Sequence, residues 1–418
     1  MNLIKQINFY KIPFLLIIFF PAFLLVGRVA TEIGVFLIII FFLYDIFKRK
    51  NYIFFKNFYF YYFLLFYLYL LVRTFFYSLE FEDYKTILFY LRFGFFFLAF
   101  NYFLMKININ KKFLFIILFF FIFLILDSIM QFYFKSNTIG IELYKERATS
   151  FFGQSLRLGS FLLRFFPFVL IIILLSEIDL KKNKFYLSIF FSFYFHTVFL
   201  TGERTSLILL FLMLSFVFLL LNRFRMILII GLFFFIGITS ASNYFSEIKP
   251  LESMWNRTTS QAIVKNEKSD VYLVKIFSKD HHGHYLIAWR MFLDNPLFGQ
   301  GVNSFKKLCK IDKFIKNDGI CSTHPHNTYL QLLAEAGLTG FLFVFFIFIL
   351  ILRYFFVKIY FNWKNKVNLN KYESIKYISL LAIFINFWPF SPNGNFFNNW
   401  LSAMYYYPVG FYLYSRNK

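Results

Sequence analysis

Residues 321–352 read CSTHPHNTYLQLLAEAGLTGFLFVFFIFILIL, and this stretch decides the fold class. Its second part, residues 328–352, is mostly apolar and exceeds the roughly 20 residues that a helix needs to cross the hydrocarbon core of a bilayer. The polar head in front of it contains His324, His326 and Asn327. The stretch therefore predicts a membrane helix with polar chemistry at one of its ends.

The composition of the whole chain agrees with this interpretation. Of 418 residues, 60% are hydrophobic and 16% are charged, and the mean hydropathy is +0.63. Soluble globular proteins carry about 25% charged residues. The composition therefore excludes a soluble globular protein and predicts an integral membrane protein. Its 72 phenylalanines are expected to face lipid or to pack between helices.

About twelve apolar segments are long enough to be membrane spans. Helices are expected for all of them, because a spanning helix satisfies its own backbone hydrogen bonds. The predicted fold class is therefore an all-α polytopic membrane protein. The predicted spans are 12–27, 29–47, 57–76, 87–105, 112–130, 156–176, 185–200, 204–221, 226–242, 328–352, 375–390 and 397–414.

Between these spans, connections that are rich in basic residues alternate along the chain with connections that are not. Lys and Arg total 44 against 21 Asp and Glu, an excess of +23. Such an excess indicates either a nucleic-acid surface or topology determinants, and here every second connection is basic. The positive-inside rule therefore predicts that both termini are cytoplasmic, and it removes nucleic acid as a partner. The basic connections contain Lys48–Lys50, Lys106, Lys111, Lys181, Lys182, Arg223, Arg225, Lys358, Lys364 and Arg416.

Residues 243–327 are the one long stretch without a predicted span, and they fall on the non-cytoplasmic side. They hold five of the six histidines and both cysteines. Loops of this length are usually functional. Apolar spacing over Tyr285–Leu293 predicts a helix that ends at Asp294-Asn295-Pro296. The expected organisation is nine membrane helices in 1–242, a periplasmic loop with short helices in 243–327, and three more membrane helices in 328–418.

Cys309 and Cys321 lie in this loop with eleven residues between them. In an oxidising compartment, a disulfide is the natural interpretation. The alternative is a metal site that the cysteines form with His324 and His326, because both residue types bind zinc.

The head of the 328–352 segment has two interpretations. Gly337 and Gly340 lie at a spacing that lets another helix approach closely, and Asn327 or Thr328 would cap the helix. Packing and capping do not require imidazoles, however. A histidine at the membrane face is suited to be a general base for a sugar hydroxyl, and His326 is the candidate.

Arginines on the external side break the orientation rule. Arg204 follows Glu203 in a tight turn and enters an apolar segment, where an ionisable group is a functional candidate. Arg147, Arg157 and Arg164 occur within eighteen residues. Their guanidinium groups suit phosphate oxygens. The alternatives are snorkelling of Arg204 or its pairing with Glu203, and, for the arginine cluster, contact with anionic lipid headgroups.

These motifs together resemble a known family. His326-Asn327, nine residues and then Gly337 and Gly340 are similar to the signature of the bacterial O-antigen ligase and polymerase superfamily. The turn Gly202-Glu203-Arg204-Thr205, the string Asn295-Pro296-Leu-Phe-Gly299-Gln-Gly301 and the single large loop resemble that family as well. The resemblance covers most of residues 140–410.

The resemblance implies a GT-C-like helical arrangement and a metal-independent glycosyltransferase without a cofactor. Such enzymes lie in the bacterial inner membrane and move a glycan from undecaprenyl diphosphate to lipid A–core at the periplasmic face. By this resemblance His326 orients or deprotonates the acceptor hydroxyl, and Arg204 stabilises the leaving diphosphate. Family members also use a loop arginine; here His284, Lys279, Arg290 or Arg257 would replace it. The residues expected to bind substrate are Arg147, Arg157, His324, Asn327, His284, Arg290 and Glu203.

Other functions remain open at this point. A polymerase that extends carrier-linked repeats would share the fold, and a protein acceptor is a further possibility. A polysaccharide flippase or transporter would also suit twelve spans. A transporter predicts ionisable groups near the bilayer midplane and repeated halves. The polar residues of this chain instead gather at the external ends of the spans, which favours chemistry at that face.

Overall fold

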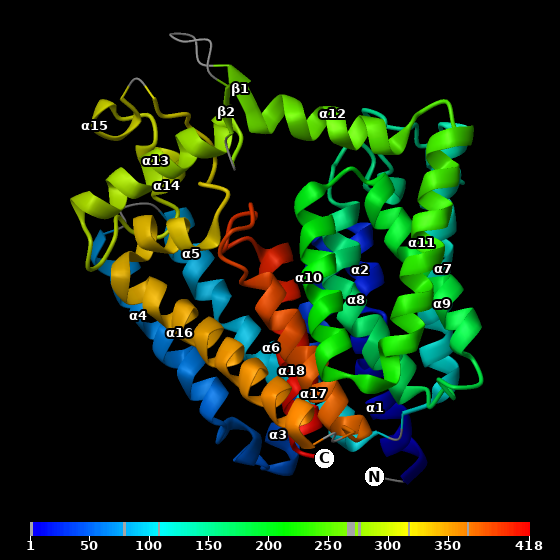
Figure 1. Ribbon diagram of the computed structural model, residues 1–418. Coiled ribbons are helices and arrows are strands. Elements are labelled where there is room, and N and C mark those ends of the chain that lie inside the picture. The colour runs from blue at the N-terminus through cyan, green and yellow to red at the C-terminus, as the bar shows by residue number, and fades with distance from the viewer. Residues whose placement is uncertain are drawn as a thin grey trace.

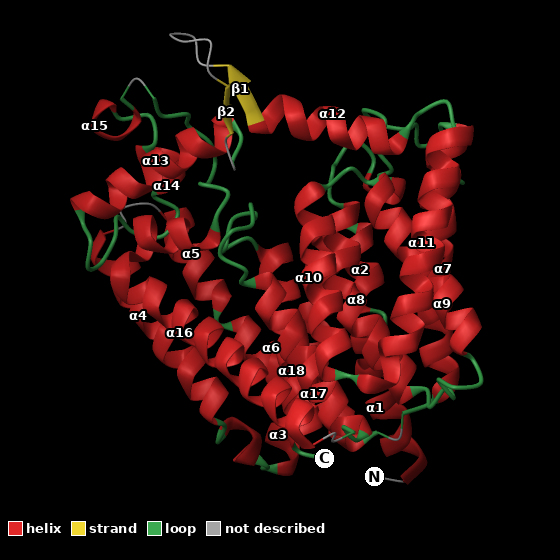
Figure 2. Ribbon diagram, viewed as in Figure 1, coloured by secondary structure: helices red, strands yellow, loops and turns green. Residues whose placement is uncertain are grey.

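The computed structural model describes residues 3–77, 81–107, 109–265, 272–274, 277–316, 318–365 and 368–418. These residues are almost entirely helical, with one small hairpin of two antiparallel strands (Figures 1 and 2). Three short 3-10 turns lie at Tyr52–Phe55, Ser150–Phe152 and Asn222–Phe224. The elements are α1 (Leu3–Ile18), α2 (Phe20–Val26), α3 (Arg28–Arg49), α4 (Phe58–Tyr77), α5 (Phe81–Tyr90), α6 (Arg92–Lys106), α7 (Lys111–Phe134), α8 (Leu158–Leu175), α9 (Lys184–Leu200), α10 (Arg204–Leu220), α11 (Arg225–Phe245), α12 (Pro250–Ala262), β1 (Ile263–Lys265), β2 (Tyr272–Val274), α13 (Lys279–Asp294), α14 (Phe305–Leu308), α15 (Asp312–Ile315), α16 (Thr328–Asn365), α17 (Lys371–Asn386) and α18 (Asn399–Arg416).

The polytopic membrane class is confirmed. By length and composition, seven helices of the described residues can cross a membrane, and the number is eight if the bent pair α1 and α2 forms one span. Helices α9 and α10 are apolar but shorter. Each of the twelve predicted segments contains helix, whereas this criterion identifies fewer than twelve spans.

Three predicted helices are interrupted or extended. The segment 12–27 bends by 56° between α1 and α2, where Pro21 starts the second helix. The segment 87–105 belongs to α5 and α6, which meet at Leu91. The segment 328–352 continues to Asn365, so Lys358 and Lys364 lie on α16 itself and not in a connection.

The two ends of the helical body differ. Both termini lie at one end, called here the terminal end, and the elements α12–α15 with the hairpin lie at the opposite, loop end (Figure 1). Helix α12 runs across the loop end, and α13 begins six residues before its predicted start and ends at Asp294, as its sequence predicts (Figure 1).

The loop elements have a small hydrophobic core of their own. It contains side chains of α13, α14 and α15 and one residue of α16. A second core of this kind lets the loop elements keep a defined shape outside the bilayer, because burial of apolar surface stabilises them without lipid. Its buried members are Ile287, Ala288, Met291, Phe305, Cys309, Phe314 and Ala334.

Gly337 has a role other than helix packing. It lies at a break in α16, with φ 65° and ψ −171°, a conformation that strongly favours glycine. The turn 296–301 docks there through backbone hydrogen bonds, Leu338 N–H to the Pro296 carbonyl (2.8 Å) among them. A Cβ on Gly337 would lie 2.5 Å from the backbone of Leu297. The prediction that Gly337 serves helix packing is therefore wrong, and its role is to let loop and helix backbones meet.

Gly340 does lie at a helix contact. The ring of Tyr69 on α4 would lie 3.4 Å from a Cβ at Gly340, and the Tyr69 hydroxyl donates to the Ala336 carbonyl (2.5 Å). Nearby, the Arg73 side chain donates to the carbonyls of Phe298 (2.9 Å) and Gly299 (2.6 Å). Helix α4 thus forms hydrogen bonds both to α16 near its break and to the turn 296–301 that docks there.

Candidate functional site

Four histidine rings lie together at the loop end. The ring of His326 is 4.0 Å from that of His324, 5.2 Å from that of His284 and 5.4 Å from that of His281, measured between centroids. His281 and His284 come from α13, and the other two come from the segment before α16. His326 has a positive φ of 57°, which turns the chain just before the helix begins. The structure therefore brings together residues that are about 40 positions apart in the sequence.

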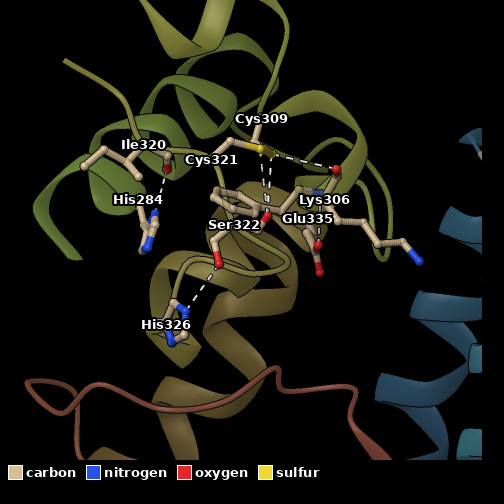
Figure 3. The surroundings of a disulfide bond; sticks show 9 residues. His284, Lys306, Cys309, Ile320, Cys321, Ser322, His326 and Glu335 are labelled. Carbon is tan, nitrogen blue, oxygen red and sulfur yellow. Dashed lines mark hydrogen bonds between the residues drawn. A yellow bond between two sulfur atoms is a disulfide. The ribbon is translucent and has the colours of Figure 1, made fainter. Parts of the chain in front are cut away.

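Hydrogen bonds orient these rings, and Figure 3 shows those of His284 and His326. Nδ1 of His284 lies 2.6 Å from the Ile320 carbonyl, which only accepts, so this nitrogen donates the hydrogen bond. The Ser322 hydroxyl lies 3.3 Å from Nε2 of His326, and Thr323 holds Nδ1 of His324 at 2.9 Å.

Burial favours the neutral form of three of these imidazoles, those of His281, His324 and His326. It lowers the pKa of His326 to about 3, with the neighbouring histidines contributing, and that of His324 to about 4. Burial also lowers the pKa of His281. A neutral imidazole can accept a proton, so this group suits a general base better than a cation for binding phosphate.

A disulfide joins Cys309 to Cys321, with their Cα atoms 5.2 Å apart, so the predicted bridge is confirmed (Figure 3). The alternative in which these cysteines bind zinc is wrong, because their sulfur atoms are bonded to each other. Cys321 is followed by Ser322, whose hydroxyl contacts His326, so the bridge anchors the segment that carries the histidine. Among the described residues, no group of three or more His, Cys, Asp and Glu side chains could hold a metal ion.

Asn327 caps a helix. Its side-chain oxygen accepts from Tyr329 N–H (3.0 Å) and Leu330 N–H (3.1 Å), and its Nδ2 donates to the Pro389 carbonyl (2.7 Å). These bonds satisfy amide groups at the start of α16. The capping interpretation is confirmed, and the expected contact of Asn327 with substrate stays a prediction.

Asn393 is a functional candidate that the sequence did not reveal. Its backbone N–H donates to the His326 carbonyl (2.7 Å), and its side-chain oxygen accepts from Arg164 on α8 (2.9 Å). Its Nδ2 lies 3.2 Å from the Thr328 hydroxyl and 3.0 Å from the Tyr405 hydroxyl. Its side chain thus contacts α8, α16 and α18, and its backbone contacts that of His326. The uncharged connection 386–398 was the only signal for it in the sequence.

Three arginines meet around Gly202, between α9 and α10. A Cβ at Gly202 would lie 2.8 Å from Nη1 of Arg257 and 3.0 Å from Nε of Arg147, and Nε of Arg147 donates to the Thr201 carbonyl (2.6 Å). Arg204 is the first residue of α10, and its charge lowers the pKa of both Arg147 and Arg257, in addition to the larger effect of burial. All three side chains are partly buried. We call Arg147, Arg204 and Arg257 the arginine cluster.

The loop that carries Arg147 is held from α7. The carboxylate of Asp127 accepts from the Thr138 backbone N–H (3.0 Å) and from the Ser150 hydroxyl. The side-chain oxygen of Gln131 accepts from the backbone N–H groups of Thr149 (2.8 Å) and Ser150 (2.6 Å). These buried bonds fix the position of Arg147 without neutralising it.

Two of the expected phosphate ligands lie elsewhere. Arg157 is exposed, and the charge that acts on it is that of Arg28 on α3. Arg290 makes a bidentate pair with Asp318 (2.6 and 2.7 Å) and also donates to the Phe314 carbonyl (3.0 Å). Arg290 is therefore used to hold α15. Of the loop cations considered as substitutes for a family arginine, Arg257 is a member of the cluster.

Glu203 is occupied by the fold. Its two oxygens accept from the backbone N–H groups of Gly159 (2.8 Å) and Ser160 (2.9 Å) and from the Ser206 hydroxyl (2.9 Å). It thereby caps the first turn of α8 from a neighbouring element and holds the turn that presents Arg204. These contacts give Glu203 a positioning role, and its expected contact with substrate stays a prediction.

The histidines and the arginine cluster belong to one region. The charge of Arg204 contributes to the lowered pKa of His281, whose ring lies 5.4 Å from that of His326. A group of fixed cations next to neutral imidazoles can bind an anionic leaving group and accept a proton from a nucleophile.

Comparison with known proteins bears on the same region. Residues 189–345 match a family model described as O-Antigen ligase. This range contains Arg204, Arg257 and the four clustered histidines, whereas Arg147 lies before it. A search of curated proteins finds no match. Over this range, which is less than half of its length, the chain is similar to the O-antigen ligase family, and this supports a relationship to the superfamily of O-antigen ligases and polymerases.

Proposed function

We propose that the protein is an O-antigen ligase-type glycosyltransferase that moves a glycan from undecaprenyl diphosphate to lipid A–core. One observation carries the proposal: the charge of Arg204 acts on His281, whose ring lies 5.4 Å from that of His326, so the arginine cluster borders the group of histidines. The loop end is then the periplasmic face of the inner membrane, and both termini are cytoplasmic. In this arrangement residues 243–327 form the periplasmic loop between membrane segments 1–242 and 328–418.

In the proposed reaction, His326 and the arginine cluster have different roles. The acceptor hydroxyl attacks the anomeric carbon of the donor glycan, and the bond between that carbon and the diphosphate oxygen breaks. His326 accepts the hydroxyl proton, and the diphosphate leaves with its additional negative charge. Cations that are already in position stabilise this charge without reorganisation, and one such donor is worth roughly 10²–10³ in rate.

The partners of the arginines suit this role. Nη1 of Arg257 is buried and has no hydrogen-bond partner within the described residues, so it is available to a phosphate oxygen. The Glu146 carboxylate is 3.9 Å from Arg257, a long contact at a partly exposed position. Phosphate groups bound by guanidinium forks do not require a metal ion, so we expect transfer without one.

Reconstitution tests the proposal. Purified protein in liposomes, supplied with carrier-linked glycan and lipid A–core, should form glycosylated lipid A–core in the presence of excess chelator. Activity that is lost on chelation and restored by Mg²⁺ or Mn²⁺ would contradict the arginine scheme.

A deletion strain separates the ligase from the polymerase. Loss of the ligase should leave long glycan chains on undecaprenyl diphosphate. A strain that instead carries a single repeat unit on lipid A–core would identify the protein as a polymerase.

A further inference from the structure

A large apolar groove lies within the helical body, away from the arginine cluster. Its volume is about 570 Å³, and its walls are formed by α4, α16, α17 and α18 with one residue of α6. Phe63, Phe66, Phe343, Ile347, Leu380 and Val409 are typical of its lining. Nothing in the proposed reaction uses this groove.

The charged lining is confined to one end. Among the described residues that line the groove, Lys376 and Arg416 are the charged ones. Arg416 is the last residue of α18 and Lys376 lies near the start of α17, so both lie toward the terminal end. Tyr59, Tyr354 and Tyr412 add hydroxyl groups to the same part of the lining. The groove thus has a polar mouth and an apolar body.

The groove is as long as one leaflet is thick. Its lining extends over Phe343–Tyr354 on α16, from Lys376 on α17 to Phe387 just after that helix, and from Tyr405 to Arg416 on α18. Each of these three ranges spans eleven residues from its first to its last position, which is about 16 Å at the rise of an α-helix. Half of a hydrocarbon core of about 30 Å is about 15 Å.

The two cations have tyrosine partners and no carboxylate. Arg416 Nη1 donates to the Tyr59 hydroxyl at 3.0 Å, and Lys376 Nζ lies 5.4 Å from the centroid of the Tyr354 ring. No ion pair recorded among the described residues includes either cation. Both charges therefore remain available to an anion that arrives from the bilayer.

We propose that this groove binds an anionic phospholipid of the leaflet at the terminal end. One acyl chain fills the groove, and the phosphate lies between Arg416 and Lys376. Burial of methylene groups supplies the affinity, and the two cations supply selectivity for anionic headgroups.

The far end of the groove argues against the polyprenyl donor as its occupant. There the Tyr405 hydroxyl is 3.0 Å from Asn393 Nδ2, and the Tyr406 hydroxyl is 3.1 Å from that of Tyr90. The lining at that end contains no charged residue within the described part of the chain. A diphosphate carrier would need cations at the loop end of the groove, and the cations lie at the opposite end.

Native mass spectrometry of protein extracted from vesicles tests this proposal. With equal amounts of phosphatidylglycerol and phosphatidylethanolamine, the wild-type protein should retain phosphatidylglycerol. The double variant Lys376→Gln/Arg416→Gln should retain roughly tenfold less of it, because each cation near the surface contributes independently to binding anionic lipid. The control Lys181→Gln/Lys182→Gln removes two charges from an exposed turn outside the groove and should retain as much as the wild type.

A second variant tests the apolar body. Val409→Trp fills the groove and should lower retention of both lipids, while a single monodisperse peak and the intact disulfide report that the chain is folded. Equal retention by the wild type and the Lys376/Arg416 variant would overturn the proposal. An equal loss in the Lys181/Lys182 control would overturn it too.

Discussion

The arginines at the loop end form two groups that differ in what holds them. Arg147, Arg204 and Arg257 meet around Gly202, where carbonyls and helix ends position them. Arg290 is paired with a carboxylate, and Arg157 lies apart beside another arginine. In the sequence, Arg147, Arg157 and Arg204 are alike in lying on the predicted external side, against the positive-inside rule. The comparison shows that the neighbours of an arginine decide whether its guanidinium group is available to bind phosphate. Its place in the sequence does not decide this.

The largest effect on transfer is expected when Arg204 or His326 is removed. Arg204→Ala or His326→Ala should lower transfer by at least about 10²–10³, because each removes a group that acts on the reacting atoms. Transfer from carrier-linked glycan to lipid A–core, measured in liposomes, checks this.

The matched control for Arg204→Ala is Arg290→Ala. It removes an arginine at the same end that is already paired with Asp318, so transfer should stay within about twofold of wild type, the range of a surface ion pair. Normal transfer by Arg204→Ala, at equal amounts of inserted protein, would refute its role.

A smaller effect is expected from Asn393, which acts through His326. Asn393→Ala should lower kcat by about 10–100-fold and leave the donor KM nearly unchanged, because a small displacement of a catalytic group is costly. The control Asn398→Ala removes a helix cap in the same connection, which costs about 1 kcal/mol of stability and should leave kcat unchanged. A change in KM alone would contradict the positioning role.

The disulfide should matter less for the rate than for stability. Replacing Cys309 and Cys321 by serine should lower the free energy of unfolding by about 3 kcal/mol, because the bridge closes a short loop. Thermal unfolding measures the loss, and mass spectrometry of the native protein should show the two peptides linked. Free thiols in protein taken from the periplasmic face would contradict the bridge.

The smallest effect concerns pH. The pKa of His326 is lowered to about 3, so its imidazole stays neutral from pH 8 to pH 5 and the rate should vary by no more than about twofold across that range. The unfolded state binds protons near pH 6.5, so stability should fall as the pH decreases from 6.5 toward 3. A rate that is halved at pH 6.5 would show that the active base has an ordinary pKa.

Some of this molecule could be predicted from its sequence because the signals are local. The length of an apolar run predicts a helix, and two cysteines in an external loop predict the bridge between Cys309 and Cys321. The break at Gly337, the role of Asn393 and the inclusion of Arg257 could not be predicted in this way. Each depends on contacts between segments that are far apart in the chain, such as Arg164 with Asn393 or Gly202 with Arg257.

The most direct test of the account is the affinity of the protein for undecaprenyl diphosphate itself. Wild type, Arg257→Ala and Arg157→Ala are compared in the same liposomes. We predict that Arg257→Ala binds about tenfold or more weakly, the value of one charged hydrogen bond, whereas Arg157→Ala binds like wild type. Equal losses in both variants, or a loss confined to Arg157→Ala, would contradict the assignment of the diphosphate to the arginine cluster.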